Sequence, residues 1–495
     1  MKVSKTTYAF TTTLVWNSIN WNTITKAVEA MQHRIVQAIK SRQFRKAKSL
    51  QRILTNSFYA KLMAVRRVTL NKGKNTPGVD GVTWITGKQK TNAALNLRSS
   101  GYKAKPMRRV FIPKSNGKKR PLAIPTLKDR AMQALFLFAL DPWHEVITDP
   151  NSYGFRKGRA CQDAIEHCFT CLSRKVSAKW VLDADIKACF DEISHQWLLE
   201  NIPIQKKVLN QWLKAGIIHK NMFNSTTQGT PQGGIISPLL ANFVLDGLEY
   251  GCRWASVQQN GKPWRADLTL NAQLVNVIRY ADDFIVTARS KEILEQRVIP
   301  FVKEFLKTRG LELSAEKTQI RHVEQGFDFL GHNIKMFDNN QRIIQPSKKS
   351  VQNIMKSVKE ATSKHKAVPH AVLIELLNPK ITGWANFFKA SCAYKSFAKV
   401  DSQIFHLTWR WAKRRHNNKN TQWIKDKYFP SVDTRKWCFQ TQLLDRVHKL
   451  KRMEEVRIIR HVKVRNAANV YDKSYKPYFL KRKMKAFVKP RKSSS

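Results

Sequence analysis

Two adjacent carboxylates lie between two apolar stretches in the middle of the chain, in Tyr280-Ala281-Asp282-Asp283. β-Branched and aromatic residues flank them on both sides, over 275–278 and 284–286. Because such residues favour strands and Asp favours turns, the pattern predicts a tight β-hairpin with the carboxylates at its bend. Adjacent carboxylates repel each other unless a cation neutralises them, so the bend is a candidate divalent-metal site. Taken alone, a tetrapeptide of this kind is more often a solvated turn.

A second apolar stretch that ends in carboxylates lies upstream of this bend. Lys179-Trp180-Val181-Leu182 leads into Asp183 and Asp185, and Phe190 and Asp191 follow. A third carboxylate beside the hairpin would complete a site for two Mg²⁺ ions about 4 Å apart, one activating an attacking hydroxyl and the other stabilising the leaving oxygen. Hard oxygen ligands suit Mg²⁺, which also accepts substrate phosphates. The competing interpretation of Asp183, Asp185 and Asp191 is a charged strand end.

These two segments resemble motifs A and C of a polymerase palm, and the Tyr-Ala-Asp-Asp form resembles that of a reverse transcriptase. Between them, residues 230–238 (Thr-Pro-Gln-Gly-Gly-Ile-Ile-Ser-Pro) resemble motif B, where glycines let bases and backbone approach closely. Residues 108–122 resemble the fingers segment, and the resemblance implies that Lys114 and Arg120 bind the incoming triphosphate. Cations suit that task, since Arg can bond two phosphate oxygens at once. Without the resemblance, this basic stretch would be interpreted as a solvated loop.

Further segments narrow the resemblance to the group II intron-encoded proteins, which combine a reverse transcriptase with a maturase. In chain order, they resemble the N-terminal extension, the second reverse transcriptase block, the later palm and primer-grip blocks, and the maturase domain: residues 71–82, 152–159, 310–318, 327–331 and 377–388. The resemblance covers roughly residues 65 to 480, with every block in the expected order.

The resemblance implies an α+β right-hand polymerase fold. It comprises fingers, a palm with an antiparallel sheet and a helical thumb, followed by a basic C-terminal DNA-binding region. Apolar residues at helical intervals among Lys and Arg also predict helices over 22–66. We expect an N-terminal helical RNA-binding lead-in over residues 1–66, fingers over 67–175, a palm with the catalytic site over 176–335, a thumb or maturase domain over 346–415, and the basic DNA-binding region with a tail over 416–495.

The resemblance also implies roles for individual residues. Asp185, Asp282 and Asp283 would be catalytic and would hold the two Mg²⁺ ions, with the backbone carbonyl of Ile186 as a further ligand. Phe190 would be the steric gate, because its ring would fill the space that a ribose 2′-hydroxyl needs. The expected nucleotide-binding residues are Lys114, Arg120, Phe190, Gln232, Gly233 and Lys317. The expected RNA and DNA contacts are Arg108, Arg109, Arg156, Lys157, Arg159, Lys413, Arg414 and Arg415.

An aromatic and basic cluster supports the last of these contacts. Trp409 and Trp411 precede Lys413, Arg414 and Arg415. Aromatic faces stack on bases while cations hold phosphates, so the cluster is a candidate nucleic-acid contact. Packing in the core is an equally good interpretation of the two tryptophans.

The net charge favours a polyanionic partner. The chain of 495 residues carries 89 Lys and Arg against 35 Asp and Glu, a formal charge of +54. Residues 401–495 hold 26 of those cations and 7 of the carboxylates, so +35 lies elsewhere and the partner should contact several domains. A merely solubilising surface is the alternative. The predicted partners are group II intron RNA, target DNA and dNTPs, and the oligomeric state stays open.

The cysteines and the hydropathy of the chain indicate the kind of cellular compartment in which the protein is expected. Seven irregularly spaced cysteines predict free thiols in a reducing compartment, and Cys168 and Cys171 lack a second cysteine pair for a zinc site. Many members of the family end in an HNH nuclease with paired cysteines. Because this chain lacks such pairs, we expect no HNH nuclease here and favour entry into DNA at replication forks. No stretch reaches transmembrane length, so no membrane partner is expected. The resemblance suggests the bacterial cytoplasm or nucleoid, with an organelle as the alternative.

The predicted function is RNA-directed DNA synthesis that also assists splicing of the parent intron and its retrotransposition into DNA by target-primed reverse transcription. A splicing-only maturase is one alternative, but the acidic residues would then be unnecessary. A retron-like or defence-associated reverse transcriptase is another. Residues 346–480 argue against it, because such enzymes generally lack a long thumb and a basic region after it. Phe190 argues against an RNA-dependent RNA polymerase.

Overall fold

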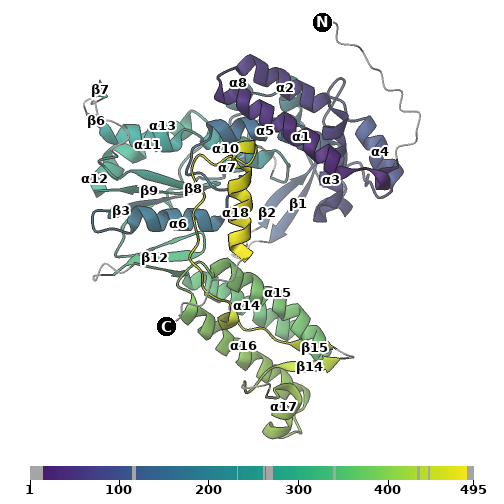
Figure 1. Ribbon diagram of the computed structural model, residues 1–495, viewed down its shortest axis with the longest axis vertical. Coiled ribbons are helices and arrows are strands. Elements are labelled where there is room, and N and C mark those ends of the chain that lie inside the picture. The colour runs from purple at the N-terminus through teal and green to yellow at the C-terminus, as the bar shows by residue number, and fades with distance from the viewer. Residues whose placement is uncertain are drawn as a thin grey trace.

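The computed structural model describes residues 15–113, 117, 119–230, 232–259, 262–263, 271–337, 342–431, 435–443 and 446–487. Figure 1 shows a helical layer from the N-terminus, a central sheet with helices on both faces, and an elongated helical unit that projects away from them. None of the described helices is both long and apolar enough to cross a membrane.

The N-terminal layer consists of three helices packed around one buried helix. Ile24, Val28, Ile35 and Ile39 recur at helical spacing and are buried, as are most residues of α5. The predicted helices over 22–66 are therefore confirmed. The layer comprises α1 (Trp21–Lys40), α2 (Phe44–Asn56) and α3 (Phe58–Leu70), which contact α5 (Leu127–Ile147), and α4 (Gly87–Leu95) lies against α3.

A four-stranded sheet extends from this layer. Its strand order is β2-β1-β4-β5, with β1 antiparallel to β2 and parallel to β4. The strands are β1 (Met107–Pro113), β2 (Lys119–Ile124), β4 (Ile217–His219) and β5 (Met222–Asn224), and α7 (Cys189–Glu192), α8 (His195–Asn201) and α9 (Lys206–Leu213) precede β4 in the chain.

The central sheet has the strand order β10-β3-β9-β8, with antiparallel pairing throughout. Alternate residues of its strands enter different cores: Leu182 and Val286 belong to the core of α10, α11 and α13, whereas Val181 and Ile285 pack with α6. The sheet therefore lies between two helical layers (Figure 1). The elements are β3 (Trp180–Ala184), β8 (Asn276–Tyr280), β9 (Asp283–Ala288), β10 (Gln319–His322), α6 (Cys161–Leu172), α10 (Ser237–Leu245), α11 (Leu248–Val257) and α13 (Ile299–Lys307), with the short β6 (Gln258–Gln259), β7 (Lys262–Pro263) and α12 (Lys291–Ile293) at the edge.

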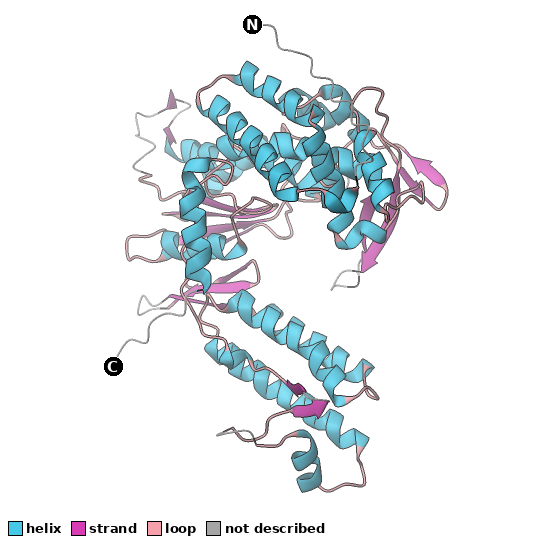
Figure 2. Ribbon diagram, turned by 45° about the vertical axis from the view of Figure 1, so that its right-hand side comes forward, coloured by secondary structure: helices cyan, strands magenta, loops and turns pink. Residues whose placement is uncertain are grey.

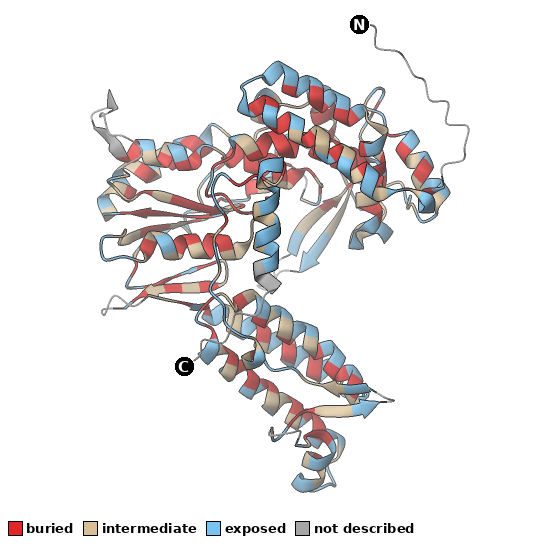
Figure 3. Ribbon diagram, in the orientation of Figure 1, coloured by how far each residue is buried: buried red, intermediate tan, exposed pale blue. Residues whose placement is uncertain are grey.

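A three-stranded sheet joins the central sheet to the projecting helical unit. That unit has its own core, which Figure 3 shows as a buried stripe along its helices. Trp411 belongs to this core, and so do Phe439 and Met453, so the core continues past residue 415. The elements are β11 (Phe327–Phe329), β12 (His332–Met336), β13 (Arg342–Pro346), α14 (Lys348–Lys364), α15 (His370–Phe388), α16 (Tyr394–Arg415), α17 (Thr421–Tyr428), β14 (Gln440–Leu443) and β15 (Arg446–Lys449).

The C-terminal segment returns from the projecting unit to the central sheet and the N-terminal helical layer (Figures 1 and 2). Its last described element is the helix α18 (Lys476–Phe487), in the part of the chain where we expected a tail. Asp163 is fully buried and holds this segment. Its carboxylate accepts hydrogen bonds from Arg482 (2.6 Å) and from the Val464 backbone N–H (2.7 Å), and it lies 2.9 Å from His461.

Replacing Asp163 with Ala should release this segment. Burial raises the pKa of Asp163, but hydrogen bonds from His461 and Arg482 outweigh that effect and lower it, so the carboxylate is charged at neutral pH. Breaking a buried ion pair from one side costs about 3 kcal/mol. We expect that loss in the free energy of unfolding, together with faster proteolysis after residue 460.

The matched control is Glu166→Ala, which removes a contact to the exposed Arg460 and should cost less than about 1 kcal/mol. Equal protease resistance of the Asp163→Ala variant and the parent would contradict the assignment.

Candidate active site

The predicted hairpin is present and its bend carries the two carboxylates. β8 and β9 pair in register from Asn276 with Thr287 to Tyr280 with Asp283, which leaves Ala281 and Asp282 as a two-residue loop. Ala281 has φ +60°, a conformation that two-residue hairpin loops require. The loop is therefore tight, and the paired strands fix the backbone positions of Asp282 and Asp283.

Asp185 is brought to the same end of the sheet by strand pairing. β3 runs antiparallel to β9 with Ala184 opposite Phe284, so Asp185 follows beside Asp283. The backbone carbonyl of Asp185 accepts a hydrogen bond from Ser314 N–H at 2.8 Å, and Ile186 bridges to Leu313. These contacts fix the main chain just after Asp185. The role of the Ile186 carbonyl as a metal ligand stays a prediction.

The carboxylates influence one another electrostatically. Partial removal from water, followed by the charges of Asp282 and Asp185, raises the pKa of Asp283 to about 6. Desolvation also raises the pKa of Asp282, and Asp185 adds to this shift. Lys317 forms an ion pair with Asp185, and this hydrogen bond raises the pKa of the lysine. The site thus holds more negative charge than its own lysine neutralises.

Within the described residues, no three His, Cys, Asp or Glu side chains are gathered closely enough to form a ready-made metal site. The donor set nevertheless fits Mg²⁺, because crowded carboxylate oxygens with raised pKa values gain most from a hard divalent cation. Asp185, Asp282 and Asp283 are the residues that could hold it.

Two of the predicted nucleotide-binding residues line one cavity of about 350 Å³ between the first sheet and the palm. Phe190 and Gln232 face it together with Arg109. Gln232 donates a hydrogen bond from Nε2 to Asp191 Oδ2 at 3.0 Å. Gly233 has φ +125°, and a Cβ there would lie 2.6 Å from the Ala123 carbonyl oxygen, so glycine permits this close approach.

Of the two residues predicted to bind the triphosphate, the structure describes Arg120 but not Lys114. Arg120 is exposed on β2, and its charge opposes the rise in the pKa of Asp282 that desolvation causes. Lys114 lies outside the described residues. Arg108 neighbours Arg109 on β1; burial lowers the pKa of Arg130, and the charge of Arg108 adds to this shift.

Three of the predicted nucleic-acid contacts bind within the chain, but only one of them is buried, and Lys157 is exposed. Arg156 is 6% exposed, and its guanidinium donates to Glu145 at 2.6 and 2.9 Å and to two backbone carbonyls. Arg159 donates to the carbonyls of Pro150 and Asn466. Lys157 lies over the Tyr471 ring. The prediction is wrong for Arg156, whose donors are used within the protein, and the other two hold the C-terminal segment.

The predicted cations of α16 lie on the projecting unit. Lys413, Arg414 and Arg415 are all exposed. Arg414 and Arg415 line a cleft between α14 and α16, and Arg415 also donates to the carbonyls of Lys366 and Val368. Trp411 is buried beneath Arg415, so core packing is the correct interpretation of that tryptophan. The other cations of the cleft are Lys359, Lys366 and Arg410.

Arg279, a charged residue within the strand before the bend, was not among the predicted site residues. It is 1% exposed and forms an ion pair with Asp246 at 2.9 Å. A single cation inside an otherwise apolar strand beside the predicted bend was the available signal.

An antiparallel sheet that presents three carboxylates at one end, faced by a basic sheet and followed by a helical thumb, defines the right-hand class of nucleic-acid polymerases. Residues 112–334 match the family described as reverse transcriptase (RNA-dependent DNA polymerase). Residues 16–97 match the N-terminal domain of reverse transcriptase, and residues 351–429 match the maturase-specific domain of group II introns.

Curated relatives match more than half of the chain. Protein YkfC of Escherichia coli is 33% identical over an alignment of 303 residues, which covers 55% of this chain and 80% of that protein. The group II intron-encoded protein LtrA of Lactococcus lactis is 31% identical over 55% of this chain, and the match spans about half (54%) of LtrA. The putative COX1/OXI3 intron 2 protein of Saccharomyces cerevisiae is 25% identical over 65% of this chain and 42% of its own length. The chain belongs to the group II intron-encoded reverse transcriptases and is an RNA-directed DNA polymerase.

Proposed function

We propose that the chain copies RNA into DNA with two Mg²⁺ ions held by Asp185, Asp282 and Asp283. The observation that carries this proposal is the antiparallel pairing of β3 with β9, which brings Asp185 to the bend that holds the other two carboxylates. When bound, the ions would activate the attacking primer hydroxyl and stabilise charge on the leaving oxygen.

The remaining residues of the site would select and orient the nucleotide. Arg120, which is exposed on β2, would donate hydrogen bonds to phosphate oxygens, and Lys114 would do the same. The exposed ammonium of Lys317 would exchange Asp185 for a phosphate when the nucleotide arrives. Phe190 and Gln232 would face the sugar and base across the cavity that they line.

The second proposed role is assistance to splicing of the parent group II intron and to its integration into target DNA. The match of residues 351–429 to the maturase-specific domain supports it, as does the cleft between α14 and α16. Five Lys and Arg side chains line that cleft without a carboxylate among its lining residues, so it suits an RNA backbone. The C-terminal basic surface would then be shared between intron RNA and target DNA.

Sequencing the RNA that purifies with the full chain tests this role. We expect a structured intron RNA that salt releases. A plot of the logarithm of the binding constant against the logarithm of the salt concentration should have a slope of about −0.7 to −0.9 for each neutralised phosphate. A bound short satellite-type RNA would instead support a retron-like enzyme. A bound intron with no primer extension on any RNA template would leave the splicing-only alternative.

A further inference from the structure

Arg279 is the largest side chain in the described structure that is less than 2% exposed. It lies on β8, three residues before Asp282, so its guanidinium is buried directly behind the catalytic bend. An arginine in such a place must be paired, because an uncompensated buried charge is strongly unfavourable.

The guanidinium joins the bend to helix α10. Its Nη2 lies 2.9 Å from Asp246 Oδ1, and its Nη1 donates to Asn242 Oδ1 at 3.0 Å and to the Ala281 carbonyl at 3.4 Å. Asp246 is held in turn by His144 (2.6 Å) and by the Thr148 hydroxyl (2.8 Å). One planar group therefore contacts a carboxylate, an amide and the carbonyl of the residue in the left-handed conformation.

The loop before α6 supports the bend from the same side. A Cβ on Gly154 would lie 2.3 Å from the Ala281 nitrogen, and the Gly154 carbonyl accepts a hydrogen bond from Asn242 Nδ2 at 3.0 Å. The backbone of Arg279 exchanges hydrogen bonds with this loop, to the carbonyl of Asn151 (3.1 Å) and from Tyr153 N–H (2.8 Å). Asn242 thus bonds both to the arginine and to the loop that touches the bend.

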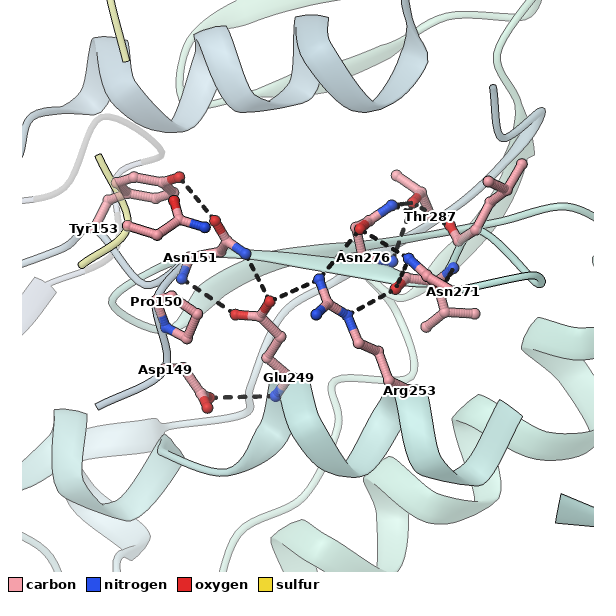
Figure 4. Close-up of polar contacts among 12 residues, drawn as sticks. Asp149, Pro150, Asn151, Tyr153, Glu249, Arg253, Asn271, Asn276 and Thr287 are labelled. Carbon is pink, nitrogen blue, oxygen red and sulfur yellow. Dashed lines mark hydrogen bonds and ion pairs between the residues drawn. The ribbon is translucent and has the colours of Figure 1, made fainter. Parts of the chain in front are cut away.

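A polar framework fixes that loop (Figure 4). Glu249 accepts hydrogen bonds from the side chain (2.6 Å) and the backbone (3.1 Å) of Asn151, and its own N–H donates to Asp149. Arg253 links Glu249 to Asn276 at the start of β8. The loop therefore cannot move without breaking several hydrogen bonds.

We infer that Arg279 is a positioning residue for the polymerase reaction, which holds the Ala281–Asp282 bend at the end of the sheet where Asp185 lies, so that the carboxylates can share the metal ions. The inference rests on the proposed metal role of the carboxylates. A buried ion pair that merely stabilises the core would need the Asp246 contact alone. The contacts to Asn242 and to the bend carbonyl go beyond that need, and a misplacement of about 1 Å in an active site can cost about a hundredfold in rate.

The test is Arg279→Lys in the full chain, assayed by primer extension on an RNA template with Mg²⁺ titration. Lysine keeps a charge for Asp246 but has no planar fork to reach Asn242 and Ala281 as well. We expect kcat to fall about 10- to 100-fold, KM for template–primer to stay within about twofold, and the Mg²⁺ concentration for half-maximal activity to rise several-fold.

Arg309→Lys is the matched control, because Arg309 also donates to α10, at the Val244 carbonyl, but lies away from the bend. Its kcat and Mg²⁺ requirement should equal those of the parent. Asn242→Ala removes the amide that links Arg279 to Gly154 but leaves the ion pair between Arg279 and Asp246. If Arg279→Lys does not fold, Asn242→Ala should still raise the Mg²⁺ concentration for half-maximal activity.

An unchanged Mg²⁺ requirement in both Arg279→Lys and Asn242→Ala, with only a lower melting temperature, would overturn the inference and leave a structural ion pair. Failure of the proposed function gives a different result, because Asp282→Asn would then synthesise DNA normally whatever Arg279 does.

Discussion

The Asp282→Asn variant should be inactive in DNA synthesis while it still binds RNA. Asparagine has nearly the shape of aspartate but lacks its charge, so the bend should keep its conformation while the metal site loses a ligand. Metal ions supply several kcal/mol of charge stabilisation in the transition state, so we expect a loss of about a thousandfold or more in kcat. Single-turnover primer extension on an RNA template measures this loss.

RNA affinity in the same variant should stay within about twofold of the parent, because RNA affinity comes from cations that bind phosphate and Asp282 is an anion. Asp426→Asn is the matched control, since Asp426 lies on α17 of the projecting unit and contacts Gln422. Its activity should be normal. Normal synthesis by Asp282→Asn would remove Asp282 from the site.

The Phe190→Ala variant should accept ribonucleotides. The Phe190 ring is half-buried and lines the cavity that also contains Gln232, so its removal opens space in the predicted nucleotide site. Steric exclusion discriminates sharply between substrates, and we expect the ratio of kcat/KM for dNTP over rNTP to fall roughly tenfold to a hundredfold. Paired primer extensions with each nucleotide measure this ratio.

Phe337→Ala serves as the control, because Phe337 is an exposed aromatic residue at the end of β12, where it contacts Lys335. Its selectivity should match that of the parent. If Phe190→Ala showed unchanged selectivity together with normal dNTP use, the gate assignment would be wrong.

Local sequence pattern was sufficient to predict the hairpin that carries Asp282 and Asp283. Strand-forming residues on both sides of Asp282 and Asp283 left the bend as the only place for a turn, and the structure has β8 and β9 on each side. The N-terminal helices followed from apolar residues at helical spacing in the same way. Such features depend on neighbours in the chain, so a linear reading can find them.

Charge was the less reliable guide. Arg156 and Arg415 are both arginines in basic segments, yet Arg156 is buried against Glu145 and Arg415 is exposed on α16. Sequence pattern does not distinguish these cases, because the partner of Arg156 becomes adjacent only when α5 and the following loop have folded. The helix over 476–487 was missed for a similar reason, since its contacts with Asp163 and Gly158 cross more than three hundred residues.

The types of group available could be predicted from the residues alone: a paired carboxylate bend, a third carboxylate at a strand end, an aromatic residue nearby and a large excess of cations. Which of these groups come together depends on the folded chain. Pairing of β3 with β9 brings Asp185 to the bend, and burial of Arg279 against Asp246 supports that bend from behind. The physical reason is that hydrogen-bond register and desolvation act between segments distant in the chain, whereas propensity acts only between neighbours.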